Sequence, residues 1–89
     1  MSFQSTFKAL SDSTGREILA LLKKGSLTAG DIGTHFDITG PSISHHLSVL
    51  KESNLISAEK RGTYIYYELN MSVIDEILGW AADLRGGTQ

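Results

Sequence analysis

The chain contains no cysteine, which excludes a disulfide framework, a metal site built on thiolates and a thiol redox switch. It also lacks any apolar run near the roughly 18 residues that a membrane-spanning helix needs. The N-terminal residues 1–4 show no basic segment followed by an apolar one, as a secretory signal would. From these absences we expect a cytoplasmic protein without thiol chemistry.

Size and charge limit the function further. The 89 residues have room for one core, so we expect residues 1–89 to form a single domain. A formal net charge of −2 is unfavourable for nucleic-acid binding, which depends on neutralising phosphates. However, basic residues gather at 23–24, 51 and 60–61, whereas acids between 75 and 83 lie in the last third. The sequence therefore permits a basic face opposite an acidic one.

Apolar spacing predicts two helices near the N-terminus. Phe3, Phe7 and Leu10 fall at i, i+4 and i+7, which is typical of a short amphipathic helix. Ser11 or Asp12 can cap a second helix, which ends in two lysines and a glycine.

A capping pattern opens each of the next two helices. Thr28 and Asp31 resemble a capping box with Asp in place of the usual Glu or Gln. Thr39 caps a fourth helix that carries Pro41 in its first turn, and residues 37–40 predict a tight turn before it. A short capped helix, a turn and a second capped helix together form the helix-turn-helix plan.

The apolar period changes from helical to two after residue 54. Alternating residues at 56–59 and 64–69 predict two short strands, and Gly62 allows a tight turn between them. A last helix begins at Met71 and has two adjacent apolar stripes. The predicted fold is therefore mainly α with a small β-hairpin, a winged helix-turn-helix in the order α-α-α-α-β-β-α.

The fourth helix offers a small, neutral face to solvent. Ile43, Leu47 and Leu50 fix its inward direction. The residues that then point outward are Pro41, Ser42, Ser44, His45 and Ser48. Small polar side chains suit a helix in a major groove about 12 Å wide, so we predict DNA contact, although serine is also tolerated on any exposed helix. His46 lies nearer the core, where a structural hydrogen bond is favoured over a base contact.

The hairpin tip is a second candidate contact. Lys60, Arg61, Gly62 and Thr63 place two cations beside a glycine turn. We predict that they reach an adjacent minor groove or the flanking phosphates. Cations at an exposed sheet edge also oppose aggregation, and both roles can hold together.

The first and last helices carry more apolar surface than one small core can cover. We therefore predict a homodimer with an interface formed by Phe3, Phe7, Val73, Ile77, Trp80 and Leu84. A two-fold dimer would present two recognition helices about 34–36 Å apart to a palindromic duplex. The alternative is that Trp80 completes the core of a monomer.

Five stretches resemble the ArsR family of winged-helix repressors, over nearly the whole chain. They are residues 9–12 (ALSD), 16–19 (REIL), 27–32 (LTAGDI), 41–47 (PSISHHL) and 66–69 (YYEL). Within the family the chain is most similar to the SdpR-type autorepressors, because it is short and carries Ile-Leu-Gly-Trp at 77–80. The resemblance implies a dimer through the first and last helices, residues 41–48 in the major groove, residues 60–63 at its flank, and repression of a nearby promoter.

Departures from the family pattern bear on the site. Members usually carry Asp-Pro-Thr-Arg-Arg where residues 12–16 read Asp-Ser-Thr-Gly-Arg, so a phosphate contact there rests on Arg16 alone. Thr28 and Lys51 are further candidates for backbone contacts. Many members sense metals, but without cysteine and with no histidine at helical spacing from Asp75 we expect no metal and no cofactor. For SdpR-type members the resemblance suggests release from DNA by a membrane partner protein.

Other classes of function fit the sequence less well. Ser44 and His45 are the only pair that suggests a catalytic dyad, and neighbours on a helix point about 100° apart. The chain has no glycine-rich phosphate loop, so we expect no enzyme. The alternative to DNA binding is a winged helix that binds only proteins, with an affinity that is insensitive to salt.

Overall fold

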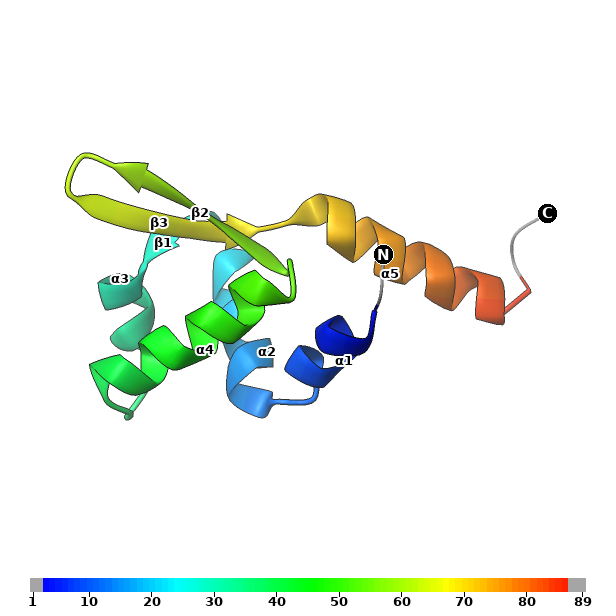
Figure 1. Ribbon diagram of the computed structural model, residues 1–89, viewed down its shortest axis with the longest axis horizontal. Coiled ribbons are helices and arrows are strands. Elements are labelled where there is room, and N and C mark those ends of the chain that lie inside the picture. Colours follow the sequence, from blue (N-terminus) through cyan, green and yellow to red (C-terminus); the bar gives the residue numbers. More distant parts are fainter. Residues whose placement is uncertain (1–2, 87–89) are drawn as a thin grey trace.

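The computed structural model describes residues 3–86, in which five helices and three strands are formed. In chain order they are α1 (Gln4–Leu10), α2 (Ser13–Leu22), β1 (Leu27–Thr28), α3 (Ala29–Gly33), α4 (Gly40–Glu52), β2 (Ile56–Arg61), β3 (Tyr64–Leu69) and α5 (Met71–Leu84). Figure 1 shows the β2–β3 hairpin, α3 and the start of α4 at one end, α2 in the middle, and α5 extending to the other end with α1 below it. The predicted winged helix-turn-helix is confirmed.

Side-chain caps begin three of the helices where the sequence predicts them. The Asp12 carboxylate accepts from two backbone amides at the start of α2. Thr28 and Asp31 form a complete capping box at α3, and the Thr39 hydroxyl accepts from the first turn of α4, which contains Pro41. Each such cap contributes about 1 kcal/mol to helix stability. The caps therefore fix where the short helices start.

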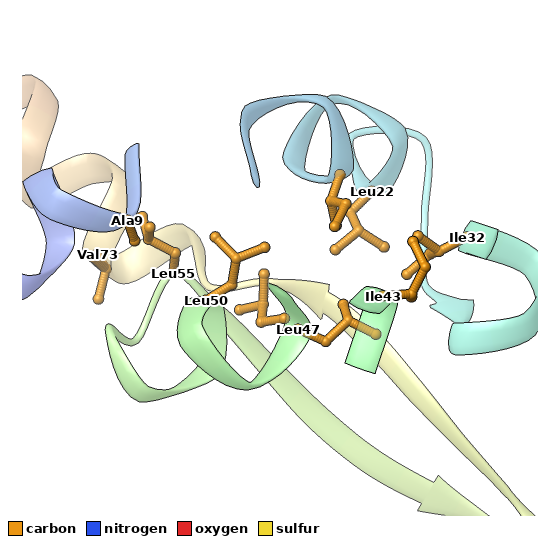
Figure 2. Close-up of a cluster of buried hydrophobic side chains, with 10 residues drawn as sticks. Ala9, Leu22, Ile32, Ile43, Leu47, Leu50, Leu55 and Val73 are labelled. Carbon is orange, nitrogen blue, oxygen red and sulfur yellow. The ribbon is translucent and has the colours of Figure 1, made fainter. Parts of the chain in front are cut away.

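The core is formed where apolar stripes of α2, α3 and α4 meet the base of the hairpin (Figure 2). Its buried members are Ala9, Ile18, Leu22, Ile32, Ile43, Leu47, Leu50, Leu55, Ile56 and Val73. The inward stripe predicted for α4 is thus confirmed. Because the core holds the inner side of α4, the opposite side of that helix is left for solvent.

The sheet has one more strand than the sequence predicts. The two residues of β1 pair antiparallel with β3, at Leu27 with Tyr67 and Thr28 with Tyr66, which gives the strand order β1-β3-β2. A strand of two residues shows no alternation, so its period cannot reveal it. At the hairpin tip Gly62 has φ +63°, and a two-residue turn with glycine first is the type II′ geometry that matches strand twist.

Helix α5 extends away from the body of the protein after its first turn (Figure 1). Val73 is 3% exposed, whereas Leu78 and Leu84 are 62% and 70% exposed. This burial corrects the predicted place of Val73 in a dimer interface, because the side chain packs in the core of its own chain. Within residues 3–86 no helix is long and apolar enough to cross a membrane.

Candidate nucleic-acid interface

Helices α3 and α4 form the helix-turn-helix pair. They pack on each other and are joined by residues 34–39. Helix α3 ends at Gly33, so Phe36 lies in the connection and packs half-buried against the core. This connection turns the chain so that α4 runs back across the molecule from the end that carries α3 (Figure 1).

The exposed side of α4 carries the residues predicted for base contact. Pro41, Ser44, His45 and Ser48 are exposed, and Ser42 is half-buried because it lies toward the flank of the helix. None of these five side chains is long or carries a fixed charge. A helix with so slim a face can approach base edges closely, and its hydroxyl and imidazole groups can donate to or accept from them.

The charge on α4 lies at its C-terminal end. Lys51, predicted to contact the DNA backbone, is exposed and follows Ser44 and Ser48 along the same side of the helix. Glu52 is exposed beside it. The neutral surface therefore covers residues 40–48. If this part of α4 enters a groove, Lys51 would lie close to the DNA phosphates.

The two cations of the hairpin point to opposite faces, because successive residues of a strand alternate. Lys60 pairs with Ile65 on the face that also carries the buried Ile56, so it lies on the side of the helices. Arg61 lies on the outer face. The contacts predicted for Lys60 and Arg61 with a minor groove or phosphates therefore start from opposite faces of the hairpin, and they stay predictions.

Arg61 is held by its neighbours on that outer face. Its Nε and Nη2 donate to Glu59 Oε1 at 3.1 and 3.0 Å. Its guanidinium carbon lies 4.8 Å from the centre of the Tyr66 ring. The bond to Glu59 is exposed to solvent, so it is weak and can be exchanged for a phosphate. The hairpin tip, with Gly62 and Thr63, is itself exposed and lies at the same end of the molecule as the start of α4 (Figure 1).

Two other predicted contact residues already have partners within the chain. Arg16 Nη1 donates to the carbonyl oxygen of Leu10 at 2.7 Å, which satisfies a carbonyl at the end of α1. A guanidinium has five N–H donors, so Arg16 keeps capacity for a phosphate. The Thr28 hydroxyl accepts from the Asp31 amide at 3.1 Å in the capping box. Their predicted DNA contacts stay predictions.

An aromatic group lies at the other end of the molecule, between α1 and α5. Phe7 and Trp80 have ring centroids 5.1 Å apart, and Phe3 lies 5.6 Å from Phe7 and 6.4 Å from Trp80. Trp80 is nevertheless 44% exposed and Phe7 37%. The three rings therefore form one apolar patch that the chain covers only in part.

The remaining residues of the predicted dimer surface differ in exposure. Leu84 continues the patch along α5, whereas Ile77 packs half-buried against the core. Leu78, next to Ile77 in the chain, is 62% exposed. Burial therefore decreases along α5, from Val73 in the core through the half-buried Ile77 to Trp80, which α1 covers only in part.

The histidines of α4 have different surroundings. His45 lies on the exposed side, and His46 Nδ1 lies 2.8 Å from Asp12 Oδ2. His46 therefore has a polar partner within its own chain, which no local spacing indicates, and the hydrogen bond predicted for it stays a prediction. In the described range 3–86 there is no group of three or more His, Asp or Glu side chains that could hold a metal ion.

Comparisons with known proteins agree with this geometry. Residues 12–58 match the family described as "Bacterial regulatory protein, arsR family". The "Transcriptional repressor SdpR" of Bacillus subtilis strain 168 is 53% identical over 76 residues, which are 85% of this chain and 84% of that protein. The "Arsenical resistance operon repressor" of Staphylococcus aureus is 41% identical over 71 residues, 80% and 68% of the two chains.

Solved structures show the same likeness. An ArsR-like transcriptional regulator from Rhodococcus sp. RHA1 superposes with a TM-score of 0.87 and 26% identity, covering 94% of this chain and 77% of that one. A second structure, of an ArsR family transcriptional regulator, has a TM-score of 0.86 and 26% identity and covers 94% and 87%.

Proposed function

Because this chain belongs to the arsR family of bacterial regulatory proteins, and so is a DNA-binding regulator of transcription, we propose that it represses its target promoter as a homodimer on a palindromic operator. The proposal extends to autorepression, by analogy with the SdpR-type repressors. The proposal rests on the observation that the two ends of the molecule expose different kinds of surface. One end carries the hairpin tip and the start of α4, and the other carries α1 and α5 (Figure 1). The first end exposes the neutral side of α4, and the second exposes the partly covered rings of Phe7 and Trp80.

The first end supports base reading by α4. We assign direct contact with bases to Pro41, Ser42, Ser44, His45 and Ser48. Four of these are exposed, and the core packing of Leu47 and Leu50 turns them away from the body of the protein. The short side chains let the helix axis approach the floor of the major groove.

Contacts with the DNA backbone are assigned to the residues around that helix. They are Arg16, Thr28, Lys51, Lys60, Arg61, Gly62 and Thr63. Lys60 and Lys51 are exposed and supply charge directly. Arg61 supplies its charge when a phosphate replaces Glu59 as its partner, so the negative net charge of the chain does not prevent binding.

The second end supports dimerisation through α1 and α5. A large aromatic residue buries about 150–250 Å² when it is fully covered, and Phe3, Phe7 and Trp80 have exposed surface still to bury. Leu84 and Ile77 continue the same side of α5. A second copy related by a two-fold axis would cover this patch with its own and would place two α4 helices side by side on one face of a duplex.

Selection of bound duplexes from a random pool tests the proposal. We expect a palindrome whose half-sites lie about one helical turn apart, roughly 10–10.5 base pairs. The affinity for the selected duplex should fall steeply with salt, with a slope of several units of log K against log salt concentration. Failure to enrich any sequence, or an affinity independent of salt, would contradict specific DNA binding.

The location and the inducing signal complete the proposal. A regulator of bacterial transcription acts on the chromosome, so we assign this protein to the cytoplasm and assign it no catalytic role. Release from DNA by a membrane partner protein stays a prediction from the resemblance to the SdpR-type repressors.

A further inference from the structure

A polar contact between His46 and Asp12 links the middle of α4 to the start of α2. His46 Nδ1 lies 2.8 Å from Asp12 Oδ2. The carboxylate is itself fixed, because Oδ1 accepts from the Thr14 amide and Oδ2 from the Gly15 amide, both at 3.3 Å. Asp12 therefore caps the N-terminus of α2 and also contacts α4 through His46.

The helices around this contact approach each other closely. A Cβ at Gly15 would lie 3.3 Å from the carbonyl oxygen of Ala9 and 3.6 Å from Leu50 Cδ2, so α1, α2 and α4 meet at this point. A second polar tie follows at the end of α4, where the buried Thr6 hydroxyl donates to the Ser53 carbonyl at 3.2 Å. Both ties lie on the flank of α4 that faces α1, beside a cleft of about 410 Å³ between the two helices.

Rotation of α4 is the motion that such a tie controls. The buried stripe of α4 is close-packed, so it leaves only small rotations of the helix open. The polar contact of 2.8 Å at the flank of the helix favours one of these rotations over the others. With a helix radius of about 5.5 Å including side chains, a rotation of about 10° moves the exposed side chains by about 1 Å. That displacement is enough to break hydrogen bonds between those side chains and base edges.

We infer that His46 and Asp12 are positioning residues, which set the rotation of α4 and thereby the preference of the protein for its operator over other DNA. The inference rests on the proposed function. His46 itself does not contact the bases. It acts through the side chains on the exposed side of α4, of which His45 is the immediate neighbour.

The pair contributes little to folding, which makes the inference testable. The side chains of His46 and Asp12 are 23% and 43% exposed, and ion pairs open to solvent add little to stability. Variants that break the contact should therefore still fold, as a thermal melt of each variant will verify.

Two matched pairs of variants separate positioning from packing. His46→Asn places its amide nitrogen near the position of Nδ1, whereas His46→Gln places it near that of Nε2, so only the Asn variant keeps a donor for the carboxylate. Asp12→Ser keeps a good N-cap for α2 but is too short to reach His46, and Asp12→Asn keeps both the cap and an acceptor.

The probes are the duplex selected from the random pool and an unrelated duplex of the same length. For His46→Gln and Asp12→Ser we expect about three- to fivefold weaker binding to the selected duplex, because a contact open to solvent biases the rotation of α4 by no more than it contributes to stability. Binding to the unrelated duplex should change less than about twofold, since nonspecific binding depends on phosphates. His46→Asn and Asp12→Asn should bind the selected duplex almost as the native protein does. The double variant Asp12→Ser/His46→Gln should lose no more than either single one, because both remove the same contact.

Three results would overturn the inference. His46→Gln could keep full preference for the selected duplex, His46→Asn could lose as much as His46→Gln, or the losses could be equal on both duplexes. If the native protein itself prefers no duplex, the proposed function fails, which the native control reveals before any variant is compared.

Discussion

Replacement of Trp80 by alanine should weaken the dimer strongly. Trp80 is 44% exposed, which for a Trp of about 250 Å² leaves about 110 Å² for a partner subunit to cover. At about 25 cal/mol per Å² this surface is worth about 2.7 kcal/mol in each subunit. A two-fold interface contains the residue twice, so full burial would contribute about 5 kcal/mol to the dimer, and half that burial about 2.5 kcal/mol.

These values translate into a large change in the dimer dissociation constant. Trp80→Ala should raise it by about a hundredfold to several thousandfold. Sedimentation equilibrium over a range of protein concentrations measures this constant directly. The apparent melting temperature should also fall on dilution. For the variant this fall should begin at a higher protein concentration than for the native protein.

Tyr64→Ala is the matched control for this prediction. Tyr64 is an aromatic residue that is 62% exposed, but it lies on the hairpin, far from α1 and α5 in the fold. Its removal should leave the dissociation constant unchanged within about threefold. If Trp80→Ala and Tyr64→Ala behave alike, or if the native protein is a monomer at every concentration, the interface is placed wrongly.

Two further predictions concern the hairpin and the core. Arg61→Ala should weaken binding to all duplexes alike and reduce the salt slope by about one. Glu59→Ala, which removes the acceptor and the negative charge beside Arg61, should strengthen binding to all duplexes. A change of sequence preference in a binding titration would refute this role of Arg61. Leu47→Ala, at a side chain that is 1% exposed, should lower the free energy of unfolding by about 2–5 kcal/mol in urea titrations. Val49→Ala, on the same helix but 37% exposed, should cost much less, and equal losses would contradict the observed packing.

The parts of the fold that the sequence predicts are those set by local chemistry. Asp12, Thr28 and Thr39 cap helices because a short polar side chain meets free amides within three residues of itself. The neutral side of α4 follows from the spacing of its apolar residues alone. Such features need no knowledge of distant parts of the chain.

The parts that escape prediction depend on contacts between distant segments. Val73 and Trp80 are both apolar, and only the point at which α5 leaves the body decides that the first is buried and the second half-exposed. The hairpin register decides that Lys60 and Arg61 face opposite sides. The contact between His46 and Asp12 joins helices that are not adjacent in the chain, and no spacing rule relates the two residues.

The central claim is that the exposed side of α4 reads bases. The most direct test is the affinity of His45→Ala for the selected duplex and for an unrelated duplex, with His35→Ala as the control. His35 is also exposed, but it lies beside Phe36 and α2 and not on α4. We predict that His45→Ala loses about 1–3 kcal/mol of binding free energy on the selected duplex only, and that His35→Ala loses nothing on either. Equal losses on both duplexes, or equal behaviour of the two variants, would contradict the claim.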